Sequence, residues 1–166
     1  AYDAVRDFEK VDLRGAKAGF EAVPDMVQVL FRFTVVLNHF KNRISIVENL
    51  YGDEVSRMDE LVGVLANNNI AQYSFQAVGE VESSVTDEQY RDMVRRGIGH
   101  THRGDVFQIV PSRRFSRAFR GDEFNVYRAL RSINPSPYLF YFDFGGFRIF
   151  GSSPETHLRV RGGQAY

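Results

Sequence analysis

The chain has 166 residues, near the usual size of a single domain and enough to bury a core, and 43% of them are hydrophobic, so we expect it to fold. The absence of Cys excludes a disulfide framework, a thiolate nucleophile and a cysteine zinc site. The 15 Phe and 8 Tyr favour a core built on sheets. The 21 basic side chains balance the 21 acidic ones and no apolar run reaches membrane-spanning length, so we expect neither nucleic acid nor a membrane as a partner.

The first half of the chain predicts strands, then one amphipathic helix. Residues 1–25 show no sustained period and predict an irregular or helical segment. Two apolar stretches, at 26–37 and 43–47, predict a β-hairpin around the polar break between them. Residues 53–66 carry apolar side chains at spacings of three and four, which predicts a helix. Residues 70–85 then predict a linker that includes an extended segment.

The second half of the chain begins with a clear helix signal. Thr86 and Gln89 form a capping box, apolar side chains follow at helical spacing, and Gly104 predicts the helix end. The remaining predicted elements are strands at 106–110, 139–142, 147–150, 157–160 and from 164 onward, and a helix at 123–132. This order predicts an α+β fold with mixed, largely antiparallel sheets and flanking helices, rather than a doubly wound parallel sheet.

The string GDVFQIVPSRR carries one amide in an apolar strand pattern. Strand alternation places Phe107 and Ile109 on one side and Gln108 on the other, where its neighbours are valines. A buried amide needs hydrogen-bond partners, so Gln108 is a candidate site residue.

Two proline-containing strings follow, NPSPY and GSSPE. In GSSPE, the proline biases Ser153 toward extended geometry and has its own φ fixed, so Glu155 is presented from a stiff backbone. This arrangement suits a positioned acid.

These three strings, at residues 104–114, 134–138 and 151–155, resemble the chorismate-utilising enzymes, and anthranilate synthase component I in particular. The resemblance implies that the chain forms part of the chorismate-binding α/β/β/α sandwich. Residues 1–85 would be the end of the N-terminal region, with its hairpin and linker, and residues 86–166 the opening part of the catalytic domain. The chain would then be a middle portion of a longer polypeptide and inactive by itself.

The resemblance also implies roles in a reaction that displaces the C4 hydroxyl of chorismate. Glu155 matches the glutamate that protonates this hydroxyl as it leaves. Gln108, Gly151 and Ser153 are expected at the substrate and nucleophile site. Isochorismate and salicylate synthases carry a Lys that activates water where Gln108 stands, so Gln indicates the amine-adding members, anthranilate synthase and aminodeoxychorismate synthase.

In anthranilate synthase, NPSPY followed by Met forms part of the site that binds tryptophan as a feedback inhibitor. The matching effector residues are Asn134, Pro135, Ser136, Pro137, Tyr138 and Leu139. Tyr138 would supply an aromatic wall and the prolines a preformed pocket, while Leu139 replaces the usual Met at similar volume. Without the resemblance, the two prolines would simply end the preceding helix.

The implied function is anthranilate synthase component I, a lyase of tryptophan biosynthesis that converts chorismate and ammonia into anthranilate and pyruvate. A glutamine amidotransferase subunit or domain would supply the ammonia. The family's Mg²⁺ ligands lie beyond the SPE string, so we expect them beyond Tyr166 and no metal ligand within this chain. No signal peptide is visible, which favours a cytoplasmic protein.

Three alternatives remain at this level. The chain is compatible with aminodeoxychorismate synthase component I of the folate pathway, or with a noncatalytic module that keeps the effector pocket without the chemistry. The string SRRFSRAFR at 112–120 interleaves Arg with Phe, which also fits stacking on a nucleic-acid strand.

Overall fold

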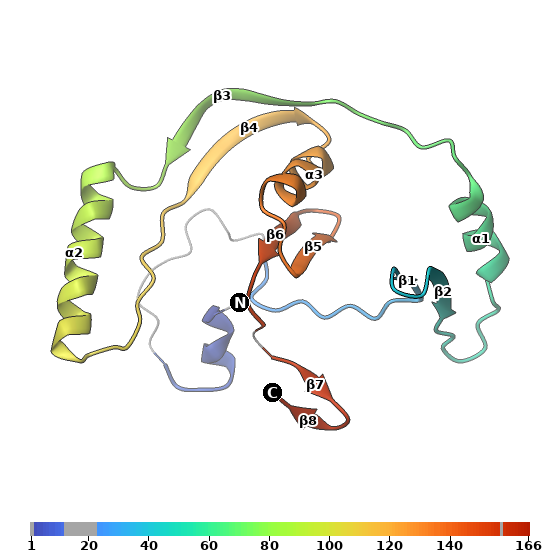
Figure 1. Cartoon of the computed structure of the whole chain (residues 1–166), viewed down its shortest axis with the longest axis horizontal. Coiled ribbons are helices and arrows are strands. Elements are labelled where there is room, and N and C mark those ends of the chain that lie inside the picture. The colour runs from blue at the N-terminus through green and yellow to red at the C-terminus, as the bar shows by residue number, and fades with distance from the viewer. Residues whose placement is uncertain (1, 12–22, 157) are drawn as a thin grey trace. The chain divides into compact units, whose positions relative to one another are not determined.

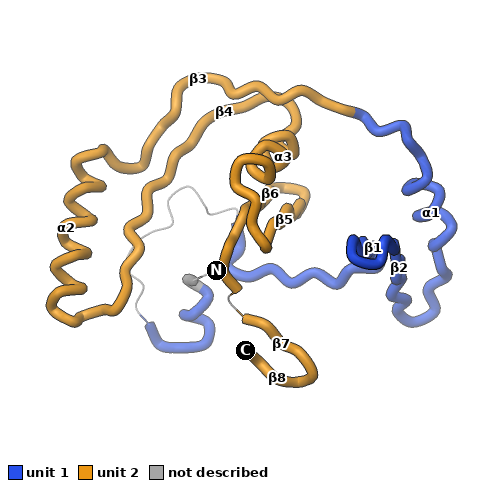
Figure 2. The backbone as a smooth tube through the Cα atoms, viewed as in Figure 1, with its two compact units in different colours: residues 1–71 blue, residues 72–166 orange. Residues whose placement is uncertain are grey.

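The computed structural model describes residues 2–11, 23–156 and 158–166, and it divides into two compact units, residues 1–71 and 72–166 (Figure 2). Every strand pair in the described part of the chain is antiparallel, and helices alternate with the hairpins, so the predicted α+β class is confirmed. The domain division after residue 85 stays a prediction. Along the chain, the boundary between the two units falls after residue 71, because the extended segment that follows pairs with a later strand.

The first unit holds a short helix, a β-hairpin and an α-helix. Its elements are the 3-10 helix η1 (Tyr2–Asp7), β1 (Phe33–Asn38), β2 (Arg43–Glu48) and α1 (Met58–Ala66) (Figure 1). β1 and β2 pair in continuous register, which confirms the predicted hairpin. β1 begins at Phe33 rather than at residue 26, opposite Glu48 at the end of β2, so it is as long as its partner. Of the predicted lead-in at 1–25, residues 12–22 lie outside the described part.

The helix predicted at 53–66 begins later, at Met58, because a carboxylate fixes the residues before it. Glu48 accepts hydrogen bonds from Ser56 Oγ at 2.6 Å and from the amide of Arg57 at 2.9 Å. Arg57, at the N-cap, has φ −117° and ψ 25°, outside the helical region. The chain therefore turns at the end of β2 before the helix starts.

The second unit contains the other elements of the chain. They are β3 (Phe75–Ser83), α2 (Asp87–Arg103), β4 (Phe115–Gly121), α3 (Phe124–Ile133), β5 (Tyr138–Asp143), β6 (Arg148–Ser153), β7 (Val160–Arg161) and β8 (Gln164–Ala165). β3 pairs with β4, β5 with β6 and β7 with β8 (Figure 1). The predicted helix at 123–132 and the hairpin at 139–150 are confirmed, and the terminal strands are shorter than predicted.

The capping prediction for α2 is confirmed at both ends. Thr86 Oγ1 accepts from the Gln89 amide at 3.2 Å, and Gln89 Oε1 accepts from the Thr86 amide at 2.8 Å. Gly104 adopts φ 78°, and its amide donates to the carbonyls of His100 and Thr101. The left-handed conformation suits glycine, so the helix stops where the sequence indicates.

The strand predicted at 106–110 is wrong. Residues 105–114 form no strand, and their side chains are mostly exposed, including Phe107 and Val110. The run has high β propensity, but no strand in the described part of the chain pairs with it, and an unpaired strand is not stable in water. The strand after α2 is β4 instead.

β4 comes from the Arg- and Phe-rich string at 112–120, and its side chains are engaged by β3. Phe75 and Phe119 stack with their centroids 5.5 Å apart. Arg117 Nε donates to the carbonyl of Gly79 at 3.1 Å, where the register of the two strands shifts. Most of the string thus forms β4, which pairs with β3 and is exposed to solvent along its length.

An aromatic cluster joins α3 to the β5–β6 hairpin. Tyr141 meets Phe124 edge-on at 5.0 Å and stacks with Phe150 at 5.7 Å, and Tyr127 lies 5.5 Å from Tyr141. Burial raises the pKa of Tyr141, and Glu123, which accepts from its hydroxyl at 3.2 Å, raises it further. These contacts hold the hairpin against the helix that precedes it.

In the part of the chain that the structure describes, the expected hydrophobic core does not form. Among the described residues, Ala4 is the one apolar side chain that is buried, at 5% exposure. The accessible surface is 14833 Å², whereas a folded monomer of 19.0 kDa has roughly 8400 Å². The chain therefore presents its apolar strand faces without cover, and the prediction that it buries a core by itself is wrong.

Within the described ranges, none of the helices has both the length and the apolar character needed to cross a membrane.

Candidate functional site

The β5–β6 hairpin brings two of the three candidate strings together. NPSPY runs from Asn134, the C-cap of α3, to Tyr138, the first residue of β5. The residues GSS of the other string end β6. In the antiparallel register Tyr138 lies opposite Ser153, and Phe140 lies opposite Gly151. The glycine turn between the strands, at Gly145 and Gly146, therefore folds GSSPE back onto NPSPY.

Three serines join the two strings through hydrogen bonds. Ser152 Oγ lies 2.6 Å from the Asn134 carbonyl oxygen, to which it donates, and 2.7 Å from Ser136 Oγ. Ser136 Oγ in turn donates to the Ser153 carbonyl at 2.9 Å. Because Ser136 and Ser153 are half-buried, these bonds are partly protected from competing water.

The predicted acid follows this network directly. Glu155 lies two residues beyond the end of β6 and its side chain is exposed. Ser153 Oγ lies 3.4 Å from both the amide nitrogen and the carbonyl oxygen of Glu155. On the far side, the Tyr138 hydroxyl shares a hydrogen bond with Thr156 Oγ1. The backbone that carries Glu155 is thus held on both sides.

Gly151 is covered by an aromatic ring. A Cβ at this position would lie 2.7 Å from Cζ of Phe140 and 3.0 Å from its Cε1, closer than atoms pack. The absence of a side chain lets the Phe140 ring lie across the hairpin. This gives Gly151 a packing role in addition to the substrate-site role that the resemblance implies.

The effector string lies at the surface of the hairpin. Ser136 and Leu139 are half-buried, whereas Asn134, Pro135, Pro137 and Tyr138 are exposed, the last at 45%. α3 ends at Ile133, directly before the string, so the prolines also stand where a helix stops.

Gln108 is placed differently from the prediction. It is exposed in the loop 105–114, and the burial expected for its amide is wrong for this chain. With Phe107 and Ile109 it lines a cavity of about 350 Å³ against α2. A Cβ added to Gly97 of that helix would lie 3.2 Å from Ile109 Cγ2, so this glycine lets the loop approach closely.

The first end of this loop is held by a charged cluster at the end of α2. Asp105 Oδ2 lies 2.8 Å from His100 Nδ1 and 2.9 Å from Arg103 Nη2. The pKa of Asp105 is lowered mainly by its hydrogen bond with His100 and to a smaller extent by that with Arg103. The negative charge at the C-terminus of the helix is thereby neutralised locally.

The second end is held by Arg113. Its guanidinium donates to Asp87 Oδ1 at 2.6 Å and to Ser83 Oγ at 2.7 Å, and it lies over the Phe115 ring at 4.6 Å. The hydrogen bond and charge of Arg113 lower the pKa of Asp87. Sequence analysis missed this contact because Asp87 and Arg113 lie 26 residues apart in the chain.

Gln108 and Glu155 are not brought together. Gln108 lies against α2, whereas Glu155 follows β6, and the described part of the chain contains no contact between their side chains. The residues that sequence analysis missed near Glu155 are Thr156 and Ser152. The two serines of GSSPE could have indicated these contacts, since serine hydroxyls at the end of a strand can form hydrogen bonds with the neighbouring strand.

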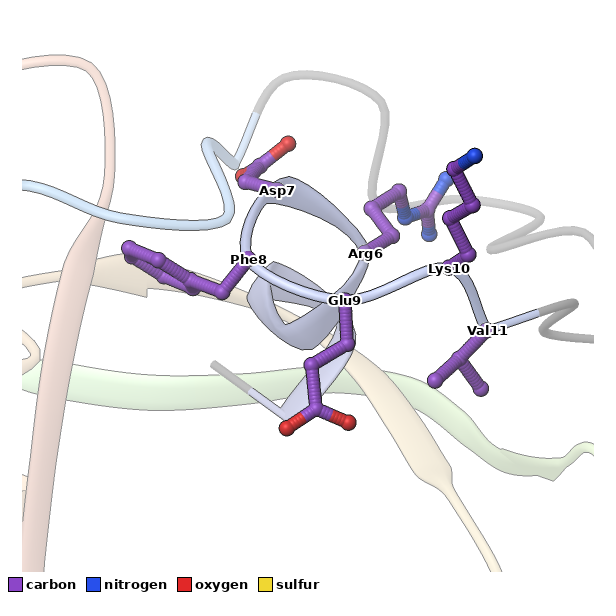
Figure 3. Close-up of a pocket in the computed structure, with 6 residues that line it drawn as sticks. All are labelled: Arg6, Asp7, Phe8, Glu9, Lys10 and Val11. Carbon is purple, nitrogen blue, oxygen red and sulfur yellow. The ribbon is translucent and has the colours of Figure 1, made fainter.

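A cavity of about 520 Å³ in the first unit holds no converging groups. It is lined by six consecutive residues, Arg6, Asp7, Phe8, Glu9, Lys10 and Val11. Their side chains radiate from the end of η1 in different directions (Figure 3). We therefore assign no site there.

Within residues 2–11, 23–156 and 158–166, no group of three or more His, Asp or Glu side chains is arranged to hold a metal ion. These residues therefore do not fit a Mg²⁺ site.

Comparison with known proteins decides the family. All 166 residues match the family described as chorismate binding enzyme. The chain belongs to the chorismate-binding enzyme family. The resemblance found in its three strings is thereby confirmed, and the strings lie within the matched region.

This chorismate-binding chain is similar to anthranilate synthase component 1 of Cereibacter sphaeroides, with 33% identity over 174 residues, covering 96% of the chain and 34% of that protein. It is also 33% identical over 183 residues to anthranilate synthase alpha subunit 1, chloroplastic, of Arabidopsis thaliana, covering 97% of the chain and 31% of that protein. The chain thus spans about a third of the length of the curated relatives it matches.

A solved structure supports the fold of this family member. The chain matches the crystal structure of anthranilate synthase component I from Streptococcus pneumoniae TIGR4 with a TM-score of 0.60 and 28% sequence identity, over 81% of this chain and 33% of that one. The arrangement of helices and antiparallel hairpins is therefore shared with an anthranilate synthase.

Proposed function

We propose that this chain contributes to an anthranilate synthase component I, which converts chorismate and ammonia into anthranilate, pyruvate and water. The observation that carries the proposal is the hydrogen-bonded pairing of NPSPY with GSSPE on one hairpin, within a chorismate-binding chain whose curated relatives bear this name. The folate-pathway alternative lacks a corresponding observation.

In the proposed reaction, ammonia attacks C2 of chorismate, the ring double bonds shift, and the C4–oxygen bond breaks. Glu155 donates its proton to that oxygen, so the hydroxyl departs as water. Loss of a ring proton and of the enolpyruvyl group as pyruvate then makes the ring aromatic. The stiff Ser153–Pro154 approach presents the acid to the leaving oxygen.

Gln108 favours ammonia over water as the nucleophile. A neutral amide donates and accepts hydrogen bonds but takes no proton at neutral pH. It therefore orients a nucleophile that is already unprotonated, and it does not activate water. A glutamine amidotransferase partner would supply the ammonia in the cell, and we place the enzyme in the cytoplasm.

The effector and the metal belong to the same proposal. Tryptophan would bind against Tyr138 and the prolines of NPSPY and inhibit the enzyme. Mg²⁺ would be held by residues beyond the SPE string, where the resemblance to the family places its ligands.

The proposal is tested in a polypeptide of full family length that contains residues 1–166, obtained from the gene or by grafting them into the Cereibacter sphaeroides relative. We call this the full-length enzyme. With chorismate, ammonia and Mg²⁺ it should produce anthranilate, followed by fluorescence. Formation of aminodeoxychorismate instead would contradict the proposal, and the 166-residue chain alone should form no product.

The effector assignment has its own test. Tyr138→Ala in the full-length enzyme removes the aromatic wall and should raise the tryptophan concentration needed for half inhibition by roughly tenfold or more, an order-of-magnitude expectation for loss of an aromatic contact with the ligand. Tyr166→Ala is the control, because Tyr166 lies in the β7–β8 hairpin. Equal inhibition of all three proteins would place the effector elsewhere.

A further inference from the structure

The segment that carries Glu155 is anchored by the effector string on both sides. Before Glu155, the carbonyl of Ser153 accepts from Ser136 Oγ at 2.9 Å. After it, Thr156 Oγ1 shares a hydrogen bond with the Tyr138 hydroxyl. Ser136 and Tyr138 both belong to NPSPY, so one string holds the other at two points around the same residue.

We propose that Tyr138 and Ser136 are positioning residues for Glu155, in addition to their place in the effector string. This inference rests on the proposed role of Glu155 as the acid. Neither residue transfers a proton in the reaction. They fix the backbone from which the carboxyl reaches the leaving oxygen.

The backbone between the two anchors has little freedom. Ser153 is paired with Tyr138 at the end of the β5–β6 ladder, and the ring of Pro154 fixes its φ. The Ser153 hydroxyl lies 3.4 Å from the Glu155 amide, which further limits the turn. With Thr156 held as well, the remaining freedom lies mainly in the torsions of Glu155 itself.

Loss of one anchor should therefore act on the rate rather than on binding. A general acid must lie within hydrogen-bond reach of the oxygen it protonates, and a displacement of about 1 Å can cost a factor of about 100. Release of Thr156 frees the C-terminal side of the turn and lets Glu155 occupy more than one position. We expect kcat to fall by roughly 10- to 100-fold with little change in the KM for chorismate.

Tyr138→Phe is the variant that isolates this effect, because it keeps the aromatic ring and removes the hydroxyl. Thr156→Val removes the other partner of the same hydrogen bond at nearly constant shape. Both should lower kcat by a similar factor. Tyr166→Phe is the matched control, since it deletes a tyrosine hydroxyl that bonds Gln164 in the β7–β8 hairpin.

The decisive experiment is a double-mutant cycle in the full-length enzyme, with ammonia as the nitrogen source and no tryptophan. If Tyr138 acts through Glu155, Tyr138→Phe lowers kcat when Glu155 is present and has no further effect in the Glu155→Gln background. An equal fall in both backgrounds, or a normal kcat for Tyr138→Phe and Thr156→Val, overturns the inference.

Failure of the proposed function would look different. In that case the Glu155→Gln single variant retains a near-normal kcat, irrespective of the kcat of Tyr138→Phe. A fall caused by unfolding is recognised from the melting temperature and from Thr156→Val, which tests the same bond without changing the aromatic ring. A loss of kcat that tracks the folded fraction in both variants counts against positioning.

Discussion

The β5–β6 hairpin joins two of the three strings that resemble the family, and the loop 105–114 contains most of the third. The two regions are organised in different ways. The hairpin has its polar groups bonded to one another, with Ser152, Ser136 and Ser153 in a chain of short contacts. The polar bonds of the loop lie at its ends, at Asp105 and Arg113, while its centre is exposed and lies beside α2.

The difference follows from the sequence separation between each region and the residues that it bonds to. The hairpin joins residues close in sequence, so its register and its hydrogen bonds form within this chain. The apolar centre of the loop has no strand beside it in the described part of the chain. The bonds around the Glu155 segment are therefore made locally, whereas the side chain of Gln108 is exposed.

The largest expected effect tests the chemistry of the hairpin. Glu155→Gln in the full-length enzyme keeps the shape of the side chain but removes the transferable proton. We expect kcat to fall by a factor of about 10² to 10⁴ with the KM for chorismate little changed. Steady-state kinetics with ammonia measure both constants, and a near-normal kcat would remove the hairpin from the reaction centre.

The packing of the hairpin can be tested at its glycines. Gly151→Ala places a methyl group 2.7 Å from the Phe140 ring, so the ring must move and unfolding should become easier by about 1–3 kcal/mol. Gly146→Ala is the control, because a Cβ there meets nothing within 4 Å. Denaturant titration of the full-length variants measures the difference, and equal stability of the two would refute the tight hairpin described above.

The helix that precedes the loop should respond more weakly. Thr86→Ala removes the capping hydrogen bond to the Gln89 amide and should destabilise α2 by about 1 kcal/mol. Thr101→Ala in the same helix removes a hydroxyl bonded to the Gly97 carbonyl and should cost less, because Ala favours the helix. Hydrogen exchange of the α2 amides separates the two, and a larger effect of Thr101→Ala would contradict the assignment of the cap.

The smallest effect concerns the anchor at the end of the loop. Arg113 lowers the pKa of Asp87, so their pair stabilises the fold above the unfolded pKa of about 3.9, and this contribution is lost as the pH falls through the lower folded value. Relative to their intrinsic exchange rates, loop amides should therefore be less protected below about pH 4, and Asp87→Asn should show this low protection at all pH values. Glu88→Gln, in the same helical turn, is the control and should keep the pH dependence.

Sequence patterns predicted the elements whose signals are local. Thr86, Gln89 and Gly104 mark the two ends of α2 through contacts within one turn, and the glycine turn of the β5–β6 hairpin is equally self-contained. The failures involve distant partners. The run at 106–110 has strand composition but no strand beside it, and β4 arose from a string whose Arg content suggested a surface.

The candidate site also combines features with local sequence signals and contacts between residues distant in sequence. The roles of Glu155 and of the effector residues stay predictions from their strings, and the structure adds that Ser136 and Tyr138 bond to the Glu155 segment. That contact depends on the register of two strands, which a proline-rich string does not encode by itself. The pairing of Asp87 with Arg113 was equally hidden, because it requires β3 and β4 to meet first.

The long β3–β4 ribbon also affects biosynthesis. Ser83 pairs with Phe115, and everything between them, α2 included, must be made before this pair can form. β3 therefore leaves the ribosome with its edge unpaired and with Phe75 and Val81 uncovered. The capped helix α2 can form during this interval, since its signals are local, and it shortens the distance that β4 must travel to close the ribbon. We therefore expect the unpaired edge of β3 to be open to aggregation and to chaperones between the synthesis of these two strands.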